Sequence, residues 1–265
     1  MVDSIPYQAV LGIQFYVGDM DGALELTKRG GLVIAPSAPV LVDLTRDAAH
    51  RAALESCDFA LTDSGFMVLL WRLFKGQSLP RISGLKYLRA LLGTPEFRKM
   101  GATYWIMPSA EDAAANCAWL QQQGVNVNLS DCYVAPIYSK GALEDPVLLA
   151  LIEESHPRFV VLCVGGGVQE RLGYYLRRNL SAFKDADVQS LYAPCGLPAI
   201  ICIGAAIAFL SNRQVNIPVW ADRFMLGWFL RSLRDPAKYV PRYWKALKLV
   251  PLLFRYGTDG IPYKT

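Results

Sequence analysis

The chain has 265 residues, of which 53% are hydrophobic and 19% charged, and its formal net charge is +4 at pH 7. This length supplies a core for one large or two small domains. The composition excludes intrinsic disorder, collagen and sustained coiled coils. The mean hydropathy is +0.23, but the longest apolar run, residues 197–210, is too short to cross a bilayer.

The N-terminus and the cysteines bear on where the protein works. The first 20 residues lack the basic region and cleavage site of a signal peptide. Six cysteines are scattered without CxxC pairs, which argues against a disulfide framework or a zinc finger. We therefore expect a cytoplasmic protein. His50 and His156 lack nearby nucleophilic or acidic partners, so we expect them at helix ends or on the surface, not in catalysis or a metal site.

Apolar strand-like runs alternate with longer amphipathic stretches. The expected strands, in chain order, are residues 31–35, 59–61, 104–107, 125–129, 159–164 and 199–204. The expected helices are residues 40–56, 66–74, 85–99, 110–123, 145–155 and 169–180. This alternation predicts an α/β protein, a Rossmann-like layered fold with a mainly parallel sheet. Ligands bind such sheets at the carboxyl ends of the strands, so functional residues are expected directly after each strand.

Asp63 is the first candidate. It follows the expected strand 59–61 and precedes a helix, within the segment Thr62-Asp63-Ser64-Gly65. An aspartate at this place most often caps the helix by accepting hydrogen bonds from its first amides. The second interpretation is a general base, which would remove a proton from an attacking hydroxyl. Position alone favours the cap and leaves both interpretations open.

A glycine run is the second candidate. Gly165, Gly166 and Gly167 follow the expected strand 159–164, and Gln169 and Glu170 open the next helix. Glycines let backbone amides approach a ligand closely, and a helix N-terminus favours an anion such as a diphosphate. The run lacks the full GxGxxG spacing and the acidic partner of a dinucleotide site. A tight strand-to-helix turn without a ligand is the alternative.

The last fifth of the chain differs in charge from the rest. Residues 213–265 carry ten Lys/Arg and three Asp/Glu, a net of +7, whereas residues 1–212 have a net charge of −3. We place a boundary near residue 212, which leaves a basic, aromatic C-terminal helical appendage. Its cations, aromatics and aliphatics favour an anionic membrane surface; single-stranded nucleic acid and an ordinary packed helix are the alternatives. The residues expected at the membrane are Trp228, Lys238, Arg242, Trp244 and Lys245.

Five motifs in order resemble the WecG/TagA/CpsF family of bacterial glycosyltransferases (glycosyltransferase family 26). They are Thr62-Asp63-Ser64-Gly65, Arg81-Ile82-Ser83-Gly84, Gly165-Gly166-Gly167-Val168-Gln169-Glu170, Gly204-Ala205-Ala206, and a closing set of Trp228-Phe229-Leu230-Arg231, Asp235-Pro236 and Arg242-Tyr243. Three positions depart from the family pattern. The family's Thr-x-Asn is Ala35-Pro36-Ser37, its Gly-Ala-Phe-Asp ends in Ile207, and its Glu-Trp is Gly227-Trp228.

The resemblance implies an inverting, metal-independent glycosyltransferase without a cofactor. It would move a sugar from a UDP-sugar donor to a polyprenyl-diphosphate-linked saccharide, in cell-surface polysaccharide biosynthesis. Residues 1–212 would bind the nucleotide sugar, and residues 213–265 would dock the enzyme peripherally on the inner face of the cell membrane. Catalysis is assigned to Asp63, as the base, and to Arg231. Substrate binding is assigned to Ser83, Gly84, Gly165, Gly166, Gly167, Gln169, Glu170, Gly204 and Arg234.

The departures leave the donor sugar open and support a second hypothesis, a non-catalytic membrane-associated partner in a polysaccharide assembly complex. A nicotinamide-dependent oxidoreductase is a third hypothesis, which rests only on the α/β pattern. No nucleic-acid partner is expected. A homo-oligomer is compatible with the sequence, but the sequence does not give the number of subunits.

Overall fold

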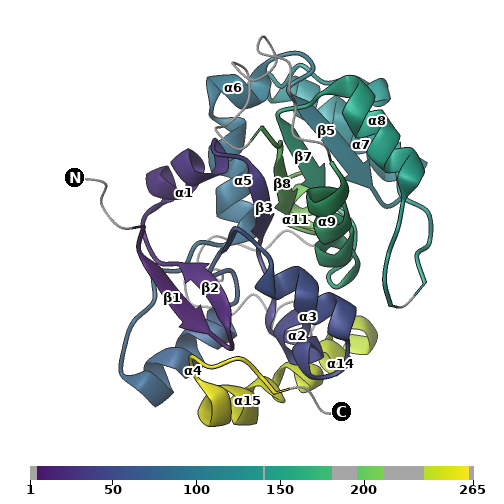
Figure 1. Cartoon of the computed structure of the whole chain (residues 1–265). Coiled ribbons are helices and arrows are strands. Elements are labelled where there is room, and N and C mark those ends of the chain that lie inside the picture. Colours follow the sequence, from purple (N-terminus) through teal and green to yellow (C-terminus); the bar gives the residue numbers. More distant parts are fainter. Residues whose placement is uncertain (1–4, 140, 181–195, 212–235, 263–265) are drawn as a thin grey trace.

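A single mixed sheet organises the fold. The computed structural model describes residues 5–139, 141–180, 196–211 and 236–262. Within them the strands form an eight-stranded sheet in the order β1-β2-β4-β3-β8-β7-β5-β6, parallel except for the β1–β2 pair (Figure 1). The strands are β1 (Tyr7–Val10), β2 (Ile13–Tyr16), β3 (Gly31–Ile34), β4 (Phe59–Ala60), β5 (Thr103–Met107), β6 (Cys132–Val134), β7 (Phe159–Leu162) and β8 (Ala199–Cys202). The predicted α/β class is confirmed.

The inner strands are buried on both faces. Every residue of β3, β7 and β8 is buried, because helices cover the sheet on both sides. Successive side chains of a strand point to opposite faces. Leu32 and Ile34 accordingly pack in one hydrophobic cluster, and Val33 packs in the other.

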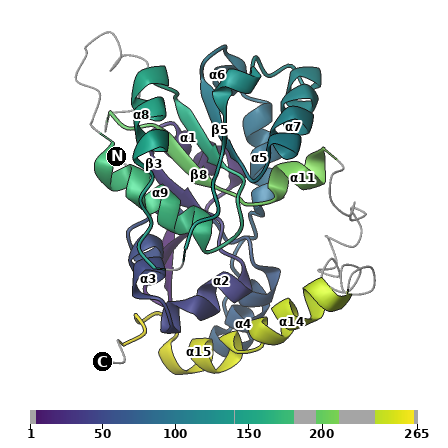
Figure 2. The ribbon, with the colours of Figure 1, turned by 90° about the vertical axis from the view of Figure 1, so that its right-hand side faces the viewer.

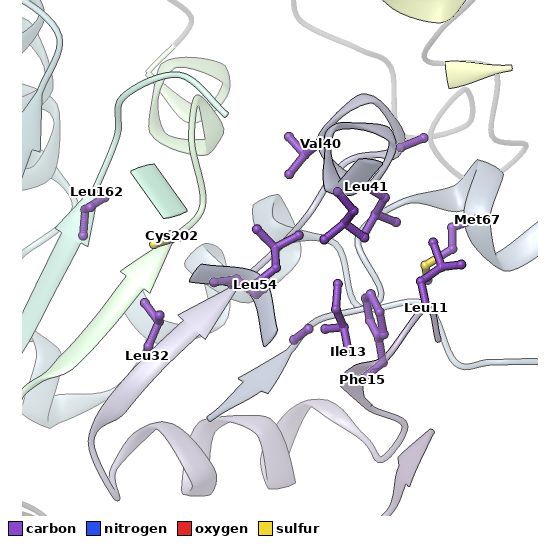
Figure 3. Packing of buried hydrophobic residues seen from close by; sticks show 14 of the residues in the cluster. Leu11, Ile13, Phe15, Leu32, Val40, Leu41, Leu54, Met67, Leu162 and Cys202 are labelled. Carbon is purple, nitrogen blue, oxygen red and sulfur yellow. The ribbon is translucent and has the colours of Figure 1, made fainter. Parts of the chain in front are cut away.

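The helices divide between these two clusters. Packed with Leu32 are residues of α2 (Ala38–Val42), α3 (Ala48–Glu55), α4 (Gly65–Lys75), α8 (Pro146–Ser155) and α9 (Val168–Asn179). Packed with Val33 are residues of α1 (Met20–Thr27), α5 (Gly84–Leu92), α6 (Pro95–Arg98), α7 (Ala110–Gln122) and α11 (Ala206–Leu210). Figure 3 shows the first cluster, with Leu32, Leu162 and Cys202 on neighbouring strands and Val40 and Leu41 on α2.

The strand order places the ligand crevice. The strand β8 comes last along the chain among the described strands, yet it lies between β3 and β7 in the middle of the sheet. The chain adds β4 on one side of β3, and then β5, β6 and β7 on the other side of β8. Such a change of direction opens a crevice at the carboxyl ends of the strands that flank it. The segments that follow β3, β4, β7 and β8 therefore surround the candidate site.

The C-terminal residues 236–262 pack against this body. The helices α14 (Pro236–Ala246) and α15 (Leu249–Tyr256) lie along α2 and α4 (Figure 2). Leu249, Leu253 and Ile261 join the same cluster as Leu32. Backbone hydrogen bonds of 2.8 and 3.2 Å run from Leu11 and Gly12 to residues 257 and 258. Residues 213–235 lie outside the described residues, so the boundary near residue 212 stays a prediction.

Some expected elements were wrong. Residues 125–129 form no strand: Val125 and Val127 are buried, but the chain turns into a 3₁₀ helix, η2 (Leu129–Asp131), and the strand is β6. The expected helix 40–56 is broken into α2, a 3₁₀ turn, η1 (Asp43–Thr45), and α3, because Asp47 caps α3 by accepting from the His50 amide at 2.9 Å.

Two further details differ from the expectations, and one expectation is confirmed. The expected helix 85–99 is divided into α5 and α6 before Pro95. His50 lies in the first turn of α3, so the helix end expected as one of its two positions is confirmed, and it is buried there, with Nε2 3.0 Å from the Val40 carbonyl oxygen. The β1–β2 hairpin and α1 were not predicted.

Candidate active site

The glycine run forms the loop between β7 and α9. Gly167 has φ +90°, and side chains hold both of its polar groups: its N–H donates to Glu170 Oε2 at 2.5 Å, and its carbonyl accepts from Arg171 Nε at 2.9 Å. The Gly165 carbonyl accepts from the amides of residues 168 and 169, each at 3.2 Å. Gly165 and Gly166 are exposed, and no described residue accepts from their amides. These two N–H groups are placed to bind an anion at the start of α9.

Gln169 and Glu170 are buried behind this loop. The Gln169 Oε1 atom accepts from the Gly204 amide at 2.6 Å, and its Nε2 atom donates to Glu170 Oε1 at 2.9 Å. Gln169 therefore joins the loop after β7 to the loop after β8, where Gly204 has φ +58°. Direct contact of Gln169 and Glu170 with substrate stays a prediction, since the bonds described here orient the loop.

The thiol closest to this network is not a nucleophile. Cys202 donates through Sγ to the Gln169 carbonyl at 3.3 Å and is fully buried. Burial and the nearby charge of Glu170 raise the pKa of the Cys202 thiol well above its usual value. The thiol therefore stays protonated at neutral pH, and Cys202 acts as a packing residue.

Asp63 lies after β4, but it does not cap α4. The cap of α4 is Ser64, whose hydroxyl accepts from the Met67 amide at 3.2 Å. Asp63 Oδ1 instead accepts at 2.9 Å from the amide of Gly84, the first residue of α5. The interpretation of Asp63 as the cap of its own helix was wrong. The carboxylate is held at the start of a second helix, where the positive end of the helix dipole stabilises negative charge.

Ser83 and Gly84 hold this second helix start against the sheet. Ser83 caps α5 by accepting from the Lys86 amide at 3.3 Å. A Cβ on Gly84 would lie 3.5 Å from Ala35 Cβ and 3.7 Å from Ile203 Cβ. A Cβ would therefore fit in ordinary van der Waals contact, and Gly84 lies beside the ends of β3 and β8. The bond from the Gly84 amide thus holds Asp63 beside the ends of β3 and β8, and the bond from the Gly204 amide to Gln169 joins the end of β8 to the glycine loop.

The helix α14 reaches the same edge. Arg242 Nη2 lies 3.4 Å from Ser37 Oγ, just after β3, and Lys245 Nζ lies 2.6 Å from Asp43 Oδ2. Two residues expected at the membrane therefore contact the body, and Arg242 lies at the rim of the candidate site. Trp244 is exposed, as expected, and Lys238 belongs to α14. Trp228, Arg231 and Arg234 lie outside the described residues.

Arg171 is a further component that the motifs did not identify. Besides the Gly167 carbonyl, it donates to the Gly141 carbonyl, and its Nη1 lies 4.0 Å from Asp47 Oδ2. It thus ties the glycine loop to the segment before α8 and to α3. The only signal in the sequence was its place directly after Glu170. Across the described residues, no group of three or more His, Cys, Asp or Glu side chains is placed to hold a metal ion.

The fold and the site together define an α/β protein with a carboxylate and exposed backbone amides at the carboxyl edge of a mainly parallel sheet. The profile of the family described as "Glycosyl transferase WecG/TagA/CpsF family" matches residues 8–260. The chain belongs to this family and is a glycosyltransferase.

One relative gives a more specific comparison. The chain is similar to the N-acetylglucosaminyldiphosphoundecaprenol N-acetyl-beta-D-mannosaminyltransferase of Bacillus subtilis (strain 168). The two are 22% identical over 228 residues, which cover 84% of this chain and 77% of the relative.

Proposed function

We propose that the chain moves a sugar from a UDP-sugar donor to a polyprenyl-diphosphate-linked saccharide, at the inner face of the cell membrane. The observation that carries the proposal is the shared edge of Asp63 and the glycine loop. On this proposal, the Asp63 carboxylate at the start of α5 and the two backbone amides before α9 face one crevice. This arrangement supplies an acceptor for a proton and donors for a diphosphate.

The reaction is a direct displacement. An acceptor hydroxyl oxygen attacks the anomeric carbon of the donor sugar, and Asp63 takes the hydroxyl proton. The bond from the anomeric carbon to the diphosphate oxygen breaks with its electron pair, so UDP leaves and the configuration inverts. The amides of Gly165 and Gly166 stabilise the leaving diphosphate. Arg231 and Arg234 are proposed to add positive charge there, and no metal ion is required.

The acceptor class follows from the name of the relative, which acts on a saccharide carried by diphosphoundecaprenol. We carry over the lipid-linked diphosphate but not N-acetylmannosamine. The segment after β3 is Ala35-Pro36-Ser37, which differs from the pattern of the family, so the donor sugar needs its own assay.

The proposed location is peripheral. No helix within the described residues is both long and apolar enough to cross a membrane. Exposed aromatic side chains on the C-terminal helices, Trp244 on α14 and Phe254 on α15, support docking on a lipid surface.

The assay measures release of UDP from a panel of UDP-sugars with a polyprenyl-diphosphate acceptor. We expect Asp63→Asn to lower kcat by about 10²- to 10⁴-fold, while UDP still raises the melting temperature. Asp19→Asn is the matched control, because Asp19 caps α1 by accepting from the Gly22 amide at 2.8 Å, away from the site. Near-normal turnover by a folded Asp63→Asn variant would refute the assignment of the base.

A further inference from the structure

The helix α4 presents an unexpected apolar surface. Its inner side buries Met67 and Trp71 in the core. Its outer side leaves Leu69 53% exposed and Leu73 72% exposed. Residues four apart lie above one another on a helix, so these two leucines form one stripe. The stripe lies in the N-terminal part of the chain, outside the predicted membrane-docking appendage.

The C-terminal helix α15 packs beside α4. Phe254 of α15 packs edge to face against Phe74 of α4, with ring centroids 5.7 Å apart, and Phe254 is still 76% exposed. Figures 1 and 2 both place α4, α14 and α15 together at one end of the molecule. We call this surface the basal face. The exposed large apolar residues of these three helices and of the turn between α14 and α15 are Leu69, Leu73, Val240, Trp244, Leu247 and Phe254.

The charge of the three helices favours an anionic partner for the basal face, although Lys245 is already paired with Asp43. Their sequences contain no Asp or Glu and six cations, which are Arg72, Lys75, Lys238, Arg242, Lys245 and Arg255. Arg72, Lys75 and Arg255 are exposed. Exposed bulky apolar side chains and cations on the same helices complement the acyl and phosphate layers of an anionic bilayer. Two copies of this cationic face would repel each other, which disfavours a second copy of the chain.

The basal face adjoins the candidate site. The helix α4 begins two residues after Asp63, and α14 packs on α2, which follows the carboxyl end of β3. Along the axis of α4, Leu69 and Leu73 lie about 6 and 12 Å from its first residue. A membrane that touches both leucines is therefore close to the edge of the sheet that holds Asp63.

We propose that α4 is a membrane-contact element of the catalytic body. Leu69 and Leu73 enter the boundary between headgroups and acyl chains beside Phe254, and Arg72 and Lys75 meet lipid phosphates. Together with α14 and α15, α4 gives the protein three separate points of contact, which set one orientation on the bilayer. The proposal rests on the proposed function for its lipid-linked substrate, but lipid binding itself needs neither donor nor acceptor.

The test is co-sedimentation of the full chain with vesicles of phosphatidylglycerol and phosphatidylcholine, with no sugar substrate present. We expect the variant L69S/L73S to bind these vesicles about 10- to 100-fold more weakly than the wild type. The matched control is M100S/L129S, because both residues are exposed and lie away from α4, α14 and α15. This control should bind like the wild type, and all variants should keep the wild-type melting temperature.

A second double variant, W244S/F254S, separates this inference from docking by the C-terminal segment. Weaker vesicle binding by W244S/F254S with wild-type binding by L69S/L73S would overturn the role of α4 and leave the C-terminal contact. A change in molecular mass by light scattering in L69S/L73S, without a change in vesicle binding, would assign the face to a second copy and also overturn the proposal. Turnover on a short-chain acceptor in detergent reports on the transferase itself, and L69S/L73S should retain it.

Discussion

At the scale of single residues, the backbone dihedral angles of Gly167 set the conformation of the glycine loop. Its φ of +90° lies in a region that residues with a side chain rarely adopt, while a Cβ there would meet no atom within 4 Å. Any cost of Gly167→Ala is therefore backbone strain. We expect Gly167→Ala to lower the free energy of unfolding by about 1–2 kcal/mol. UDP binding should also weaken, because an alanine at this position changes the backbone conformation of the glycine loop.

Gly165→Ala is the matched control for this prediction. A Cβ on Gly165 also meets no atom within 4 Å, and its φ lies outside the positive range. Denaturant unfolding should therefore give a stability for Gly165→Ala close to that of the wild type. If the two variants lost equal stability, the strain at Gly167 would not be the cause.

The sequence identified Asp63 and Gln169 correctly as residues of one edge, but it could not identify their partners. Asp63 and Ser64 are neighbours with equal ability to cap a helix. The choice between them depends on Gly84, which lies 21 residues further along the chain. The partner of Gln169 is Gly204, 35 residues away. Local patterns contain no information on such distances, so the geometry of the site had to come from the fold.

At the scale of elements, local sequence patterns again do not specify long-range partners, and this explains which strands were predicted. The runs that became β3, β7 and β8 are apolar throughout, because helices cover both faces of the sheet. Val125 and Val127 are equally apolar and are buried, yet they pair with no strand. Burial can be predicted from hydrophobicity, but hydrogen-bonded pairing depends on which edge of the sheet is available. Cys132–Val134 takes that edge, beside β5.

The segment between β6 and α8 gives a prediction on pH. Asp145, which caps α8, accepts from the hydroxyls of Tyr133 at 2.9 Å and Tyr138 at 2.6 Å. Burial, and then the hydrogen bond and charge of Asp145, raise the pKa of Tyr133 to about 12. The pKa of Tyr133 in the folded protein therefore lies above its unfolded value of 10. The contribution of the protonated Tyr133 to the stability of the fold is complete below pH 10. It is lost as the pH rises through about 12.

We therefore expect the free energy of unfolding to fall between about pH 10 and 12, measured by urea denaturation at each pH. Tyr133→Phe should reduce this fall, because its ring cannot ionise. Tyr256→Phe, on α15 and without a hydrogen bond to Asp145, is the control for replacing a tyrosine by phenylalanine elsewhere in the chain. An identical profile for the wild type and Tyr133→Phe would show that this pair does not control the transition.

At the scale of the whole molecule, the described C-terminal helices are continuous with the core. Leu253 of α15 is buried among residues of the strand cluster, while its neighbour Phe254 is exposed. We expect Leu253→Ala to cost about 2–5 kcal/mol in the free energy of unfolding. Phe254→Ala should cost far less, because its ring is largely in solvent.

Unfolding followed by fluorescence and by circular dichroism distinguishes two arrangements. If α15 belongs to the core, Leu253→Ala lowers the midpoint of a single transition seen by both probes. If residues 213–265 form an independent appendage, the variant instead separates a first, smaller transition from an unchanged second one. The latter result would support the boundary near residue 212 as a unit of folding.

The position of β8 has a consequence for how the chain is made. Until residues 199–202 leave the ribosome, β3 and β7 have no strand between them, and each presents an unpaired edge of buried, apolar residues. The growing polypeptide must therefore keep two half-sheets apart for the time needed to translate the intervening segment. Such edges are sites of aggregation. Production of this enzyme in a cell should accordingly depend on translation speed and on chaperones that bind nascent chains.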